Sequence, residues 1–99
     1  MQFDSWNEDG YTLTDEDKKN IVEKISKLAK FSHLLNDESV KVHVEVVRGK
    51  KHESPNFGLR VQVTVPGKSL RAEASGKTIS DAVDEVERKL RAQIEKFRN

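Results

Sequence analysis

The sequence predicts an α+β fold, a two-layer sandwich of four strands and two helices in the order βαβββα. Residues 40–47 and 59–74 alternate apolar and polar side chains, a period of two that is typical of strands with one buried face. Residues 14–31 and 79–97 repeat their apolar side chains every three or four positions, as helices lying on a core do. We therefore expect both helices to cover the same face of a mainly antiparallel sheet.

The first predicted strand lies at the N-terminus. Gln2 to Trp6 is predicted as a strand, residues 7–10 as a turn and residues 11–13 as a short extended return. The Trp6 ring would either stack on an unpaired base or pack at the sheet. Because Trp6 is isolated, packing at the core or the edge of the sheet is favoured.

Thr14 is predicted to cap the first helix, because residues 15–17 place acidic side chains over the positive end of the helix dipole. The helix is expected to run to about Phe31. Its apolar stripe consists of Ile21, Val22, Ile25, Leu28 and Ala29. Leu34 and Leu35 are expected to continue this apolar cover into the following connection.

Three further strands are predicted in the middle of the chain. The clearest covers residues 40–47, and the polar residues 48–56 form a connection to a strand that begins near Phe57. Pro66 and Gly67 then predict a hairpin turn. The polar face of the sheet is expected to be exposed and to carry Lys41, His43, Glu45, Arg60, Gln62, Thr64, Arg71 and Glu73.

The second helix is predicted to start after Thr78, its N-cap, with Asp81 three positions on. Both helices thus begin with the same T-x-x-D pattern. The apolar stripe of this helix consists of Ile79, Val83, Val86, Leu90, Ile94 and Phe97.

Composition excludes several classes of protein. The 99 residues suffice for one domain, predicted to span residues 1–99. The absence of cysteine excludes disulfides and thiol nucleophiles and fits a cytoplasmic protein. No stretch approaches the roughly 18 apolar residues that a membrane span needs. Because the net charge is only +1, a nucleic-acid-binding surface would depend on where the charges lie.

No catalytic or metal-binding motif stands out. His33, His43 and His52 fall on different elements, without a carboxylate at metal-ligand spacing. The serines lack nucleophile motifs, and the glycines form no phosphate-binding loop. We therefore expect no catalytic residue, metal, cofactor or small-molecule substrate.

Basic side chains on the two helices are the candidate functional residues. At about 100° per residue, Lys89, Gln93 and Lys96 share one flank of the second helix, and Arg91 lies on the other flank among acidic residues. The basic side chains of the first helix gather in its C-terminal half and are Lys24, Lys27 and Lys30. They form either a solvated face with i, i+4 ion pairs or a positive strip that contacts phosphates without reading sequence.

Several segments resemble the family of ribosome hibernation promoting factors, also called ribosome-associated inhibitors or sigma-54 modulation proteins. Residues 65–74, VPGKSLRAEA, are similar to the PGK-x-LRAEA hairpin of that family. Residues 23–28 match its K-x-x-K-L pattern, residues 11–14 stand at its V-E-I-T segment, and residues 79–84 follow at its M-Y-A-A-I-D segment. Because the chain ends at Asn99, it resembles the short form, without a dimerisation domain.

This resemblance implies a non-enzymatic inhibitor of translation that binds the small ribosomal subunit in the channel for messenger and transfer RNA. The rRNA-binding positions that it implies here are Lys24, Lys27, Lys89, Gln93 and Lys96, with Arg91 beside Ala92, where the family commonly has Arg. Ser80 stands in place of the usual Tyr, and Ser5 at a usually apolar strand position.

Two other functions remain open. A double-stranded-RNA-binding module has a similar architecture, but such modules place lysines at the start of the last helix, where this chain has Asp81, Asp84 and Glu85. A protein-interaction module would use the exposed sheet face or an unpaired strand edge.

Overall fold

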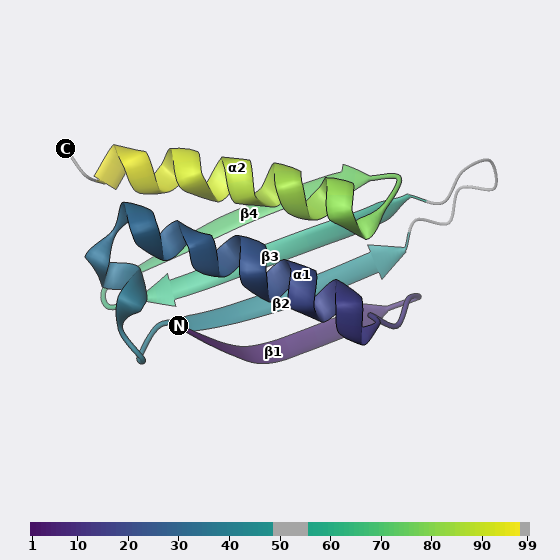
Figure 1. Ribbon diagram of the computed structural model, residues 1–99, viewed down its shortest axis with the longest axis horizontal. Coiled ribbons are helices and arrows are strands. Elements are labelled where there is room, and N and C mark those ends of the chain that lie inside the picture. Colours follow the sequence, from purple (N-terminus) through teal and green to yellow (C-terminus); the bar gives the residue numbers. More distant parts are fainter. Residues whose placement is uncertain (49–55, 98–99) are drawn as a thin grey trace.

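The four strands form one sheet in the order β1-β2-β3-β4, and the helices cover one of its faces (Figure 1). The computed structural model describes residues 1–48 and 56–97. The elements are β1 (Gln2–Asp9), α1 (Asp15–Ser26), the 3₁₀ helices η1 (Lys27–Phe31) and η2 (His33–Asn36), β2 (Lys41–Arg48), β3 (Phe57–Val65), β4 (Lys68–Gly76) and α2 (Ile79–Phe97). The predicted α+β sandwich and its βαβββα order are confirmed. Most of the predicted connection 48–56 lies outside the described residues.

The sheet is mainly antiparallel, as predicted. β2 pairs antiparallel with β3, and β3 with β4, whereas β1 and β2 are parallel. Val44 lies opposite Val61, which lies opposite Ala72, so the apolar residues of three strands share the face under the helices. The helices add Ile21, Ile25, Leu28, Val83, Val86, Leu90 and Ile94 to the buried core.

β1 is longer than predicted, because it continues through residues 7–9, where a turn was expected, and residues 11–13 lie outside any strand. A bulge at Asp4 shifts the register, so that Phe3 and Trp6 both face the helix layer and their rings stack with centroids 5.9 Å apart. The Leu13 amide donates to the Glu8 carboxylate, which satisfies the backbone there without a strand partner. The packing interpretation of Trp6 is confirmed.

The first helix changes type before it ends. Thr14 and Asp17 form the predicted capping box, with the Asp17 amide 3.0 Å from Thr14 Oγ1. The α-helix stops at Ser26, and a 3₁₀ helix continues to Phe31. The expectation for Leu34 is wrong, because its side chain is 56% exposed, although Leu35 is buried.

α2 packs closely on β4 where the two elements meet. Thr78 Oγ1 accepts a hydrogen bond of 3.1 Å from the Asp81 amide, which confirms the predicted cap. A Cβ atom at Gly76 would lie 2.8 Å from Asp81 Cβ and 2.9 Å from the Ala82 nitrogen. Glycine is therefore needed at this approach. No helix within the described ranges has the length and apolar character to cross a membrane.

Candidate nucleic-acid interface

The C-terminal halves of the two helices lie at the same end of the molecule. α1 and α2 are neighbours and run in the same direction, so the blue end of α1 with η1 and the yellow end of α2 come together (Figure 1). All six residues predicted to bind rRNA lie in these halves or in η1. The structure divides them into three groups.

The first group lies between the helices. Lys24 Nζ is 2.6 Å from Asp84 Oδ1, a contact that joins α1 to α2. The hydrogen bond to Asp84 and the negative charge of that carboxylate raise the pKa of Lys24 above its usual value. Arg91 pairs with Glu87 at 3.4 Å, and its guanidinium carbon lies 5.8 Å from the centroid of the Phe31 ring. The charges of Lys24 and Arg91 are therefore partly offset by carboxylates.

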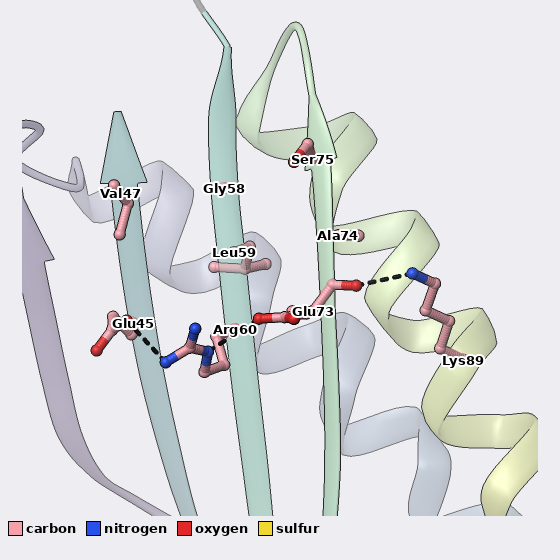
Figure 2. A pocket seen from close by; sticks show the side chains of 9 residues that line it. All are labelled: Glu45, Val47, Gly58, Leu59, Arg60, Glu73, Ala74, Ser75 and Lys89. Carbon is pink, nitrogen blue, oxygen red and sulfur yellow. Dashed lines mark hydrogen bonds and ion pairs between the residues drawn. The ribbon is translucent and has the colours of Figure 1, made fainter. Parts of the chain in front are cut away.

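The second group lies along the free edge of β4. Lys89 Nζ donates to the Glu73 carbonyl at 2.8 Å, as Figure 2 shows. The Gln93 amide donates to the Arg71 carbonyl at 2.7 Å and accepts from the Arg71 N–H at 3.4 Å. These two side chains bond the outer backbone groups of an edge strand, a role that the helical wheel did not reveal.

The third group consists of exposed cations at the end of the molecule. Lys27 and Lys30 are three residues apart in η1, and side chains at this spacing eclipse each other in a 3₁₀ helix. Lys96 lies in the last turn of α2. Within residues 1–48 and 56–97, these three lysines have no ion pair or hydrogen bond. Lys30 was predicted as part of the basic half of the first helix but was not among the rRNA-binding positions implied by the family resemblance; its alignment with Lys27 follows from the 3₁₀ geometry of η1.

The open face of the sheet has balanced charges. Arg60 lies 3.4 Å from Glu45 and 3.0 Å from Glu73. These three residues line a hollow of about 490 Å³, which Val47 and Lys89 also line (Figure 2). His43 Nδ1 is 3.6 Å from Asp4 on the same face. His33 lies in η2, and His52 falls outside the described residues. Because Arg60 and His43 face carboxylates, and Lys41 Nζ donates to Gln2 Oε1, these cations offer less to a phosphate than the lysines at the helix ends do.

Comparisons with known proteins agree on the fold. The N-terminal domain of Protein Y from Thermus thermophilus superposes with a TM-score of 0.81 at 18% identity, covering 98% of this chain and 99% of that one. A ribosomal subunit interface protein from Coxiella burnetii gives a TM-score of 0.79 at 18% identity, covering 99% and 98%. A search of curated proteins found no match.

The family assignment comes from the sequence of the chain itself. Residues 7–99 match the model of the family described as sigma 54 modulation protein / S30EA ribosomal protein. The match includes both helices, the hairpin of β3 and β4, and every residue predicted to bind rRNA. This chain therefore belongs to the sigma 54 modulation protein / S30EA ribosomal protein family.

Proposed function

We propose that this chain is a cytoplasmic, non-catalytic hibernation factor that binds the small ribosomal subunit and occupies its channel for messenger and transfer RNA. The six predicted residues, together with Lys30, would contact rRNA phosphates. Inhibition would be steric, since a filled channel does not admit transfer RNA.

The convergence of two basic helix ends is the observation that supports this proposal. Two separate segments bring lysines to one end, and Lys27, Lys30 and Lys96 are exposed there without partners among the described residues. Phosphate contacts need cations of this kind, because each contact releases a condensed counterion. The family assignment and the similarity to a ribosomal subunit interface protein from Coxiella burnetii support the ribosome as the source of the phosphates.

Co-sedimentation with purified small subunits tests the proposal. Replacing Lys24, Lys27, Lys89 and Lys96 by alanine should abolish binding while circular dichroism and thermal unfolding still report a folded chain. A matched control replaces four lysines elsewhere on the molecule, which are Lys18, Lys19, Lys41 and Lys77. Equal binding by both variants would contradict the assignment of the site.

The salt dependence gives a second measurement. The logarithm of the binding constant should fall linearly with the logarithm of salt concentration, with a slope that shrinks by about one for each lost phosphate contact. RNase digestion before sedimentation separates the rival function. Association that survives digestion would point to a protein partner on the sheet face or a strand edge instead.

A further inference from the structure

We propose that a hollow beside η1 and η2 binds one unpaired nucleobase of single-stranded RNA. The hollow has a volume of about 580 Å³ and is lined by Ala29, Lys30, Phe31, Ser32, His33, Leu34 and Asn36. This volume is within the range of about 300–1,000 Å³ typical of small-molecule sites. The inference rests on the proposed function, since it adds a base-binding site to a phosphate-binding surface.

The backbone at Ser32 creates the hollow. Ser32 is extended, with φ −158° and ψ 129°, between two 3₁₀ helices, so η2 does not continue the axis of η1. Ser32 Oγ accepts a hydrogen bond from the Leu34 amide at 3.3 Å, and the Ser32 carbonyl accepts one from Leu35 at 3.2 Å. Because Leu35 is anchored in the core, the neighbouring Leu34 side chain is directed into solvent beside the hollow.

The walls of the hollow suit the face of a base. Phe31 is half-buried, and its ring lies next to the Arg91 guanidinium at 5.8 Å. Leu34 is the most exposed large apolar side chain within residues 1–48 and 56–96. Unpaired bases pack on aromatic and apolar side chains, and a nearby guanidinium strengthens this contact. The side chains of His33 and Asn36 offer hydrogen-bonding groups for the edge of the base.

The charge around the hollow favours a nucleotide over a peptide. No carboxylate is among the side chains that line it, whereas Lys30 lines it and Lys27 lies one 3₁₀ turn away. A nucleotide supplies both a planar apolar face for Phe31 and Leu34 and a phosphate for these lysines. An acidic peptide would meet the lysines but would not supply the planar face.

Binding to small subunits, measured over a salt series, tests the site. Leu34→Ser should weaken binding by about fivefold or more at every salt concentration, because a base contact is lost, and should leave the salt slope unchanged. Lys30→Gln should instead lower the slope by about one. Val47→Ser is the matched control, since Val47 is the other exposed large apolar side chain in residues 1–48 and 56–96, and lies on β2, away from the hollow. Wild-type affinity in Leu34→Ser would overturn the inference.

A photoreactive side chain at position 34 identifies what fills the hollow. A cross-link to RNA in small subunits supports the inference, whereas a cross-link to protein, or none, overturns it. The two proposals fail differently. If the wild-type chain does not bind small subunits, the proposed function fails. If it binds and Leu34→Ser binds equally well, only the nucleobase site fails.

Discussion

Asp84 controls how much of the Lys24 charge is available to an anionic partner, because its carboxylate lies 2.6 Å from Lys24 Nζ. Asp84→Asn removes that charge without changing the shape of the side chain. We expect tighter binding to small subunits and a salt slope that steepens by up to about one, since Lys24 becomes free for a phosphate. Glu85→Gln is the matched control, as Glu85 pairs with Arg88 at 3.0 Å instead. Weaker binding by Asp84→Asn would mean that the ion pair positions Lys24 for RNA.

Gly76 sets the distance between β4 and the start of α2. Gly76→Ala should lower the free energy of unfolding by about 1–3 kcal/mol, because the new methyl group would overlap Asp81 and Ala82. Gly58→Ala is the control, since a Cβ atom there would meet its nearest neighbour at an ordinary 3.7 Å. It should change stability by less than about 0.5 kcal/mol. Urea unfolding followed by Trp6 fluorescence measures both, and equal effects would contradict the argument.

Asp17 links stability to pH through the capping box. Partial burial raises the pKa of Asp17, but hydrogen bonds from the Thr14 amide at 3.1 Å and the Tyr11 hydroxyl at 2.8 Å outweigh burial and hold this pKa below its usual value. A lowered carboxyl pKa stabilises the fold above the unfolded pKa, and this contribution is lost as pH falls through the folded value.

Asp17→Asn should therefore cost about 1 kcal/mol at pH 7, a typical value for a lost cap interaction. The difference from the parent should shrink below about pH 4 and vanish once Asp17 is protonated in both states. Urea unfolding at a series of pH values measures this trend. Asp15→Asn removes the same charge from the same turn without these hydrogen bonds, so its cost should be smaller. A cost for Asp17→Asn that does not change with pH would contradict the linkage.

At the scale of elements, α2 protects the edge of the sheet. Gln93 bonds both backbone groups of Arg71, as a fifth strand would, and Lys89 bonds the next outward carbonyl, at Glu73. An uncovered strand edge invites pairing with another chain. These residues thus have a structural role in the free protein beside the role proposed for them on RNA.

Replacing Lys89 and Gln93 together by alanine should expose this edge. We expect the double variant to self-associate at concentrations where the parent does not, as measured by analytical ultracentrifugation, and the Arg71 amide to exchange its hydrogen faster. The control variant replaces Lys96 and Gln62, which removes the same residue types without touching the β4 backbone. If the double variant behaved like this control, the protective role would be wrong.

The helix periods were readable from sequence, but the change of helix type was not foreseen. Ile25, Leu28 and Phe31 are spaced by three, a signal that fits the three residues per turn of a 3₁₀ helix. The same residues also fit a stripe of 3.6-residue period, so the sequence predicted an α-helix as far as Phe31. The hollow beside Leu34 follows from this change and from the extended Ser32, and periodicity reveals neither.

At the scale of the molecule, the sheet and its two helices were predicted because period-two and period-3.6 patterns reflect burial directly. The parallel pairing of β1 and its bulge at Asp4 were not predicted, since they depend on a partner strand 38 or 39 positions away. Five of the six candidate residues lie in the α-helices to which they were assigned, whereas Lys27 lies in η1. The partners of Lys24, Lys89 and Gln93 were not predicted, because they depend on how closely the helices and the sheet pack. A helical wheel shows the faces of one helix and not its distance to other elements.

The net charge of the sequence is only +1, but some charged side chains gather at opposite ends of the 44 Å axis. The acidic first turn of α1 and the acidic end of β1 lie at one end of the molecule (Figure 1). The basic C-terminal ends of α1, η1 and α2 lie at the other end. Affinity for RNA should therefore follow the charge at the basic end and not the net charge, because at physiological salt screening acts over about 8 Å.

Two double variants of opposite charge test this separation. Asp9→Asn with Glu16→Gln raises the net charge by two at the acidic end, and should leave the salt slope of small-subunit binding unchanged. Lys27→Gln with Lys30→Gln lowers the net charge by two at the basic end, and should reduce the slope by about two. Anisotropy of a labelled chain, titrated with small subunits between about 50 and 200 mM KCl, measures both slopes. Equal and opposite changes in affinity would show that net charge, and not its placement, governs binding.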